Sequence, residues 1–186
     1  MARMARPRPN PPALHMLVAI LVVLLPALLI VAWFQRVPEA PIAVVDPAPI
    51  VARAAAEAPF AVAVPTNLPE GWVCTRARWT PQGQAGLGGE AAAGHTLALG
   101  YLSPDRRYFA VDQRDTRPAS FIADVTREGS RAGESKLDRL WLRYTSSDGR
   151  TRSLVLQEAD HATVVSGDVE FEALEAFVGT LEFRRG

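Results

Sequence analysis

The side chains in this sequence that could do chemistry are few and widely spaced. Cys74 is the only cysteine, so no disulfide can form within the chain. His95 and His161 are far apart in the sequence, whereas a metal site needs three or four ligands held together. We expect Cys74 to be a small core residue, with a reactive or dimer-linking thiol as the alternative, and each histidine to lie at a strand end.

A glycine-rich run formally fits a phosphate-binding fingerprint. Residues Gly86 to Ala91 (GLGGEA) match the pattern G-x-G-x-x-A. The fingerprint also needs a strand before it and a helix after it, and no such unit surrounds this run, so we expect a flexible loop. The chain contains neither G-x-S-x-G nor H-E-x-x-H. The sequence therefore predicts no catalytic, cofactor-binding or metal-binding residue, and a protein that is not an enzyme.

Two aspartates stand at matching places in an internal repeat. The pattern L-x-L-x-Y-x-S-x-D-x-R occurs at Leu97–Arg107 and again at Leu140–Arg150. Alternation places both leucines and the tyrosine on one face of each strand, and the serine and aspartate in the following turn. We predict that the two apolar trios share one side of the sheet, and that Asp105 and Asp148 bond locally in solvent-facing turns. A ligand site formed by both aspartates, or a duplicated half-domain, is the alternative.

The elements that position these residues belong to an α+β fold. Apolar alternation predicts strands, and apolar residues three or four apart predict helices. We expect one domain with a mainly antiparallel sheet of about six strands and two to three helices on it. The strands are expected at Trp72–Thr80, His95–Ser103, Tyr108–Arg114, Leu140–Thr145, Thr151–Gln157 and Ala162–Ser166. A short helix behind Pro118 should end near Gly129, and a last helix should run from an N-cap at Asp168 to Phe183.

An apolar run precedes this domain. Met16 to Phe34 has no charged residue, and thirteen of its nineteen residues are Leu, Ile, Val or Phe. These side chains favour bilayer insertion by roughly 4–8 kcal/mol, and a helix of this length nearly spans the hydrocarbon core. Pro26 is compatible with such a helix. We predict a transmembrane helix over residues 13–35, in contact with the lipid bilayer through Met16 to Phe34, with His15 at its interface.

The charges beside the apolar run predict its orientation. Arg3, Arg6 and Arg8 precede it, and only Arg36 follows closely. Because positive residues stay on the cytoplasmic side, we expect a cytoplasmic tail at residues 1–12 and everything after Arg36 outside. The prediction is a single-pass protein of the cytoplasmic membrane. A cleaved signal peptide, with a mature chain that begins near Ala43, is the alternative.

A linker rich in proline and alanine is expected at residues 36–59, with a short helix that has Asp46 as its N-cap and Pro47 at its first position and that is stopped by Pro59. An extracytoplasmic domain then fills residues 60–186. Its fifteen basic and seventeen acidic residues give a net charge of −2. Nucleic acid is therefore not an expected partner, since its binding needs a basic excess. Arg106 and Arg107 are expected to be a solvated pair or a weak lipid contact.

Four short motifs are spread over the chain after the apolar run: Asp46-Pro47-Ala48-Pro49, Pro59-Phe60, Leu68-Pro69-Glu70-Gly71-Trp72 and Leu99-Gly100-Tyr101-Leu102-Ser103-Pro104-Asp105. Together with the N-terminal anchor, they make the chain resemble an actinobacterial family of single-span membrane proteins, the domain of unknown function 4245. The resemblance implies a cell-envelope protein. It brings no activity, cofactor or catalytic residue.

Three classes of function remain open. We favour a membrane-anchored, extracytoplasmic binding or interaction module of the cell envelope, with a membrane or envelope protein as a candidate partner. The second class is a structural or assembly subunit of a membrane complex, which would expose a sizeable apolar patch. The third is an envelope enzyme, in which a pocket would join His95 or His161 to a carboxylate.

Overall fold

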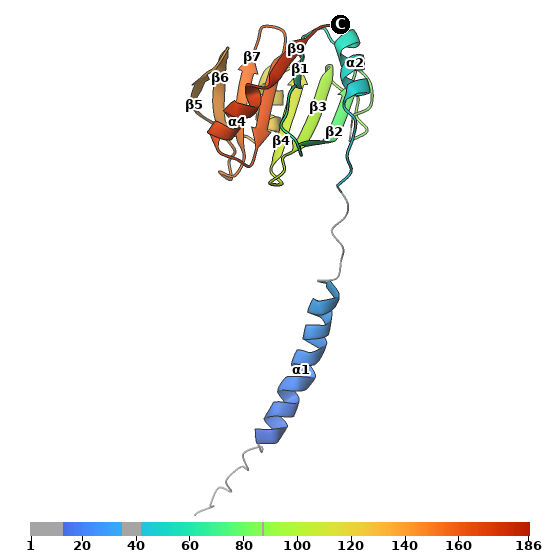
Figure 1. Cartoon of the computed structure of the whole chain (residues 1–186), viewed down its shortest axis with the longest axis vertical. Helices are drawn as coiled ribbons and strands as arrows, with labels where there is room; N and C mark the ends of the chain where they lie inside the picture. The colour runs from blue at the N-terminus through green and yellow to red at the C-terminus, as the bar shows by residue number, and fades with distance from the viewer. Residues whose placement is uncertain (1–12, 35–41, 87) are drawn as a thin grey trace, which may run out of the picture. The chain divides into compact units, whose positions relative to one another are not determined.

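The computed structural model describes residues 13–34, 42–86 and 88–186. The chain divides into helix α1 (Ala13–Phe34) and a compact domain that spans Ile42–Gly186 (Figure 1). Within α1, the segment His15–Trp33 has a mean hydropathy of 3.0 and is long enough to cross a membrane. A signal sequence near an N-terminus meets the same criterion. The predicted tail at residues 1–12 and the linker residues 35–41 lie outside the described residues.

A seven-stranded antiparallel sheet forms the centre of the domain (Figure 1). Its strand order is β2-β3-β4-β8-β7-β6-β5, so β4 and β8 join two groups of sequential strands. The strands are β2 (Val73–Thr80), β3 (Thr96–Leu102), β4 (Tyr108–Arg114), β5 (Ser130–Lys136), β6 (Leu140–Thr145), β7 (Arg152–Gln157) and β8 (Ala162–Gly167). This arrangement confirms the predicted α+β class and the mainly antiparallel sheet.

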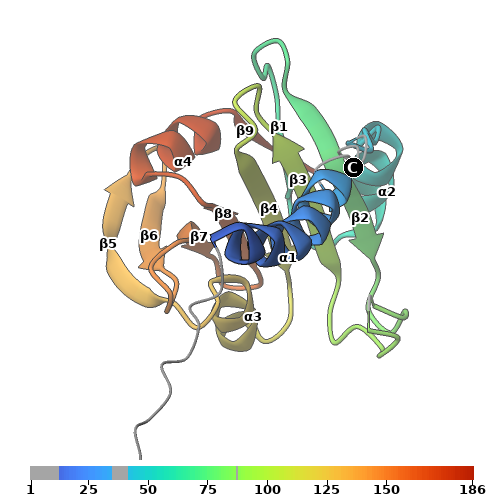
Figure 2. The ribbon, with the colours of Figure 1, turned by 90° about the horizontal axis from the view of Figure 1, so that it is seen from below.

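Different elements cover the two faces of this sheet (Figure 2). One face, here called the main face, carries α2 (Ala48–Glu57), α4 (Phe171–Val178) and a ribbon of β1 (Val62–Pro65) paired with β9 (Leu181–Arg184). The opposite face, here called the α3 face, carries α3 (Pro118–Val125), which buries Phe121 and Ile122. The larger core lies on the main face, while a single short helix covers the α3 face only in part.

The described residues contain nine strands rather than about six. Three strands were missed, and each has a local reason. β1 is four residues long and ends in Pro65. β5 exposes every residue except Ser135, so it has no apolar alternation to detect. β9 continues an apolar stripe that has helical spacing, and pairing with β1 decides its conformation.

The C-terminal helix is shorter than predicted. α4 begins at Phe171 instead of directly after Asp168, and it ends at Val178 instead of Phe183. Gly179 follows the helix, and glycine is a poor helix former. The apolar residues that remain, Leu181 and Phe183, lie in β9 and pair with β1. They are packed in the β1–β9 ribbon instead of on a helix face.

The short helix predicted in the linker is α2, and it belongs to the domain. Its N-cap is Pro47 and not Asp46 as predicted, although the Asp46 Oδ1 accepts a hydrogen bond from the Ala48 N–H at 2.9 Å. Val51 and Ala54 are buried in the main core. The compact unit consequently begins at Ile42, not at residue 60 as the composition suggested.

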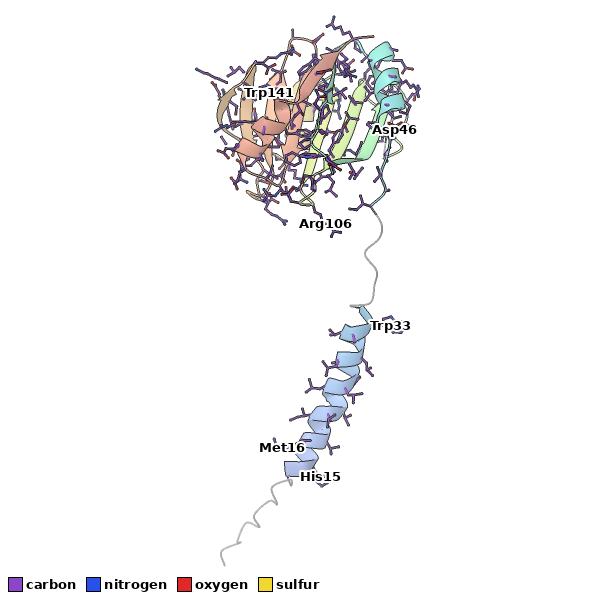
Figure 3. All side chains as sticks on the ribbon, in the orientation of Figure 1. His15, Met16, Trp33, Asp46, Arg106 and Trp141 are labelled. Atoms are coloured by element: carbon purple, nitrogen blue, oxygen red, sulfur yellow. The ribbon has the colours of Figure 1, made fainter. Side chains whose placement is uncertain are left out.

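The two apolar trios of the repeat lie on opposite faces, contrary to the prediction. Leu97, Leu99 and Tyr101 belong to the main core, whereas Leu142 and Tyr144 pack with α3 and Leu140 is 50% exposed. The strand register explains this result. Cross-strand pairing aligns Leu99 with Arg143, not with Leu142, through Val111, Val165 and Leu154. On the main face β6 instead buries Trp141, which is fully buried (Figure 3).

Candidate functional site

Both histidines contact carboxylates. His95 Nδ1 lies 2.7 Å from Asp115 Oδ2, and the His95 backbone N–H donates to the other carboxylate oxygen at 2.8 Å. His161 Nδ1 lies 2.7 Å from Asp160 Oδ1. Neither histidine lines the hollow or the groove described below. Among the described residues, no three His, Cys, Asp or Glu side chains are grouped so that they could hold a metal ion.

A row of aromatic rings accounts for these histidines. His161 stacks on Phe60 with ring centroids 4.9 Å apart, and Trp79 stacks on His95 with centroids 5.8 Å apart. Phe60 meets Trp79 edge to face at 6.3 Å, which completes the row. Trp79 also donates from Nε1 to Glu57 Oε2 of α2 at 2.7 Å. The histidines therefore pack at the two ends of a structural cluster.

The other sequence candidates also have local structural roles. Cys74 is buried in the main core, and burial raises the pKa of its thiol. The run from Gly86 onward folds back on itself, with the Gly86 N–H donating to Glu90 O at 2.8 Å. It lies between β2 and β3, and the strand β3 follows it where the phosphate fingerprint requires a helix.

Asp105 and Asp148 occupy equivalent but separate turns. Asp105 accepts a hydrogen bond from Ser103 in the β3–β4 turn, and Asp148 accepts one from Ser146 in the β6–β7 turn. These hydroxyl groups lower the pKa of both carboxyl groups. The local bonding is as predicted. Neither aspartate lines the hollow described below, and only Asp105 lines the groove, so neither of these two cavities is shared by the two aspartates.

A hollow of about 520 Å³ lies on the α3 face, beside α3. We call it the arginine-lined hollow. Figure 3 shows one of its residues, Arg106, at the end of the domain where β3 turns into β4. The lining comes from β2, the β3–β4 turn, β4, the end of α3 and the turn after it, the β6–β7 turn and the end of β8: Arg76, Arg106, Arg107, Tyr108, Ala110, Asp112, Val125, Arg127, Thr151, Ser166, Gly167 and Asp168.

Small residues in adjacent strands leave room for this hollow. Cross-strand pairing places Gly100 of β3 beside Ala110 of β4, and Ala110 beside Ser166 of β8. Paired residues point to the same face, so three small side chains form a continuous row there. A Cβ atom at Gly100 would lie only 2.1 Å from the hydroxyl oxygen of Tyr108. Glycine at this position is therefore what lets Tyr108 lie across the sheet.

An ion pair links two strands beside this row. Arg76 Nη2 donates to Asp112 Oδ1 at 2.7 Å, and the Asp112 side chain is only 14% exposed. Burial raises the pKa of Asp112 to about 6, although Arg76 and Arg114 oppose the shift. The Nε atom of Arg76 is buried and has no hydrogen-bond partner among the described residues. Beside the hollow, the buried Asp112 carboxylate thus lies next to an Arg76 Nε that makes no hydrogen bond.

Asp112→Asn is expected to change how stability depends on pH. The folded chain keeps the Asp112 proton up to about pH 6, while the unfolded chain loses it near the ordinary pKa of 3.8. The folded state therefore binds more protons in this window, and this group makes the free energy of unfolding fall as pH rises through it. The two pKa values imply that the free energy of unfolding falls by about 2–3 kcal/mol from the lower end of this pH window to its upper end.

Urea unfolding of the full chain in detergent at pH 4, 5, 6 and 7 measures this effect. The stability of the Asp112→Asn variant should rise relative to the original chain between pH 4 and 7, since contributions from other carboxyl groups cancel in the difference. Asp138→Asn, at a side chain that is 66% exposed, is the matched control. Parallel profiles for the original chain and Asp112→Asn would contradict the raised pKa.

An apolar groove of about 310 Å³ lies on the main face. Phe177 of α4 stacks on Trp72 at 5.5 Å and on Phe109 at 5.0 Å, and these rings form much of its wall. Leu68 and Pro69 also line it, which gives the Leu68–Trp72 motif a structural role. The β3–β4 turn separates the groove from the arginine-lined hollow, and Arg107 of that turn lines both.

The sequence reasoning did not find the arginine-lined hollow. It treated Arg106 and Arg107 as a solvated pair, because an isolated pair of arginines carries little information. Arg76 and Arg127 are distant in the sequence, and only the strand register brings them to the same hollow. The local signal that was available is the glycine inside an otherwise apolar strand, which often marks a close approach by another group.

The comparison with protein families decides the membership of the chain. The family described as "Protein of unknown function (DUF4245)" matches residues 10–181. The chain belongs to this family. The match confirms the resemblance that the four motifs predicted. Among curated proteins, no match to this chain is found.

Two solved structures overlap part of this fold. The crystal structure of MucB in complex with MucA(peri) aligns with a TM-score of 0.37 and 17% identity, covering 67% of this chain and 37% of that chain. The MucA/MucB complex of Pseudomonas aeruginosa aligns with a TM-score of 0.37 and 18% identity, covering 68% and 36%. This chain therefore spans little more than a third of either neighbour.

Proposed function

We propose that this chain is a membrane-anchored binding module whose domain lies outside the cytoplasm and takes its ligand in the arginine-lined hollow. The observation that carries this proposal is the hollow itself, a space of about 520 Å³ with charged side chains around a floor of small residues. A concave site with a few convergent polar groups is the usual form of a binding site. We propose binding without catalysis, because the histidine–carboxylate pairs lie in the aromatic cluster instead of in this site.

The anchor part of the proposal rests on α1 and on the flanking charges. Met16 and Trp33 lie near opposite ends of α1, with apolar side chains along its length (Figure 3). All of the described α1 side chains between these two residues are exposed, which is unfavourable in water and favourable in lipid. The three arginines before the helix favour an N-terminus inside and a domain outside.

Reporter fusions test the topology. A phosphatase that is active only outside the cytoplasm, fused after Gly186, should be active, and a reporter that works only in the cytoplasm should be silent there. Replacing Arg3, Arg6 and Arg8 with glutamate should weaken or scramble this orientation, because the arginine bias sets it. Replacing exposed arginines of the domain, such as Arg131, is the matched control. A mature chain that begins near Ala43 would show a cleaved signal instead of an anchor.

Photo-crosslinking in cells tests the binding function. A benzophenone amino acid in place of Val125, which lines the hollow, should form an adduct that mass spectrometry detects on the full chain. The same amino acid in place of Leu140, which is 50% exposed on β6, is the control. An adduct at both positions, or at neither, would contradict a ligand site in the hollow. A large membrane protein captured at Leu140 alone would favour the alternative function, a structural or assembly subunit of a membrane complex.

A further inference from the structure

The arginines that line the hollow come from three separate parts of the chain. Arg76 comes from β2, Arg106 and Arg107 come from the β3–β4 turn, and Arg127 comes from the turn after α3. The four arginines and two aspartates of the lining carry a formal charge of +2, and Asp105, which pairs with Arg107 at 2.7 Å, reduces it to +1, whereas residues 60–186 together carry −2. Positive charge is therefore concentrated here against the trend of the domain. Focusing of one sign of charge in a concave site attracts ligands of the opposite sign.

The carboxylates in the hollow are already engaged. Asp112 accepts from Arg76, and Asp168 accepts a hydrogen bond from Thr151 Oγ1 at 2.5 Å. Arg127, in contrast, has no side-chain hydrogen bond among the described residues. Arg107 pairs with Asp105 at 2.7 Å, so Arg127 is the arginine of this lining that the described residues leave without a side-chain acceptor.

One buried donor also lacks its acceptor. A guanidinium offers five N–H groups in a fixed plane, and Arg76 uses Nη2 on Asp112 while its Nε stays buried without a partner. A buried donor without a hydrogen bond costs free energy, so native proteins usually satisfy such groups with a bound molecule or water when no side chain does. The Nε itself is closed to solvent, so a ligand in the hollow would meet the exposed part of the Arg76 side chain, which is 41% exposed, and a ligand with anionic oxygens is the chemical class that suits a guanidinium.

We infer that the arginine-lined hollow binds a phosphate ester. A phosphate group presents several anionic oxygens from one centre, so arginines from different elements can contact it together, and arginine matches its geometry with two parallel hydrogen bonds. The small side chains of Ala110 and Ser166, which are paired neighbours in the lining, leave space for the rest of the ester beside the phosphate group. This inference rests on the proposed function and adds the chemical class of its ligand.

Calorimetry on the full chain in a neutral detergent tests the inference. The probes are glycerol 3-phosphate, inorganic phosphate and acetate. Glycerol 3-phosphate is expected to bind about tenfold or more tightly than acetate, and Arg106→Gln and Arg127→Gln should each weaken its binding by about tenfold. Arg131→Gln is the matched control, because this arginine lies on β5 and is 53% exposed. Binding of glycerol 3-phosphate should also weaken with added salt.

Asp112→Asn separates loss of binding from loss of folding. The variant removes the negative charge that faces an incoming anion and releases Arg76 from its ion pair. Glycerol 3-phosphate is therefore expected to bind this variant about threefold or more tightly. A damaged site would bind it more weakly, which makes the direction of the change decisive. An unchanged affinity in Arg106→Gln and Arg127→Gln would overturn the inference.

Bilayer discs distinguish a lipid headgroup from a free phosphate ester. The full chain is placed in discs of phosphatidylglycerol and in discs of a phosphate-free galactolipid, and each preparation is titrated with glycerol 3-phosphate. Weaker apparent binding in the phosphatidylglycerol discs would show that the lipid headgroup occupies the hollow. Equal binding in both discs would show that the ligand is a soluble phosphate ester.

The two proposals fail in different ways. If neither phosphate probe binds the folded chain while the crosslinker at Val125 still captures a molecule, the phosphate inference is overturned and the binding function stands. If acetate binds as tightly as glycerol 3-phosphate, the site is a general anion site and phosphate selectivity is overturned. If the Val125 position also captures nothing, the binding function itself is contradicted.

Discussion

Replacing Gln113 with leucine is expected to lower the free energy of unfolding by about 3–6 kcal/mol. Gln113 is fully buried on the main face. Its Oε1 accepts from the Ala63 N–H at 2.8 Å, and its Nε2 donates to Ala61 O at 3.1 Å and to Thr163 Oγ1 at 2.9 Å. Leucine would leave two buried polar groups and one partly buried carbonyl without their partner, and each buried group costs about 1–3 kcal/mol.

The effect should also be visible in the β1–β9 ribbon. Gln113 connects β1 to β4 and β8, so its loss should expose the backbone amides of β1 to hydrogen exchange. Urea unfolding of the full chain in detergent measures the free energy. Gln157→Leu is the matched control, because Gln157 is exposed on β7. A loss below about 1 kcal/mol in Gln113→Leu would mean that other groups or water satisfy the three partners.

Leu174→Ala is expected to cost about 2–5 kcal/mol of unfolding free energy. Leu174 is the fully buried side chain of α4, and α4 packs on β7 and β8. The substitution removes apolar contacts and leaves a cavity that a packed sheet cannot fill by collapsing. Leu140→Ala, at a side chain that is 50% exposed, should cost about 1 kcal/mol or less. Equal losses for the two variants would contradict the placement of α4 in the core.

The sequence correctly predicted those parts of the structure that depend on interactions between residues close together in the chain. The apolar run Met16–Phe34 corresponds to α1, because helix length and hydropathy are properties of a continuous segment. The Ser-x-Asp turns at Ser103 and Ser146 formed as expected, because their hydrogen bonds join residues close in sequence. The six predicted strands are present for the same reason, since alternation records burial along one strand.

Predictions that needed the relation between strands were incomplete or wrong. Alternation correctly assigned Leu140, Leu142 and Tyr144 to one face of β6, and it could not say which face of the sheet that was. The exposed strand β5 was missed because pairing with β6 stabilises it without an apolar pattern. Tertiary pairing also turned the end of the last predicted helix into β9.

The sequence by itself determined the family, the α+β class, the apolar helix and the local turns of this protein. Only the tertiary structure decided where its candidate site lies. Arg76, Ala110 and Ser166 come from three different strands and Arg127 follows α3, and only the tertiary structure brings them to the same hollow. A hollow is a space between side chains that are remote in sequence, so no pattern along the chain records it. Its volume and its charge arise together when the sheet forms.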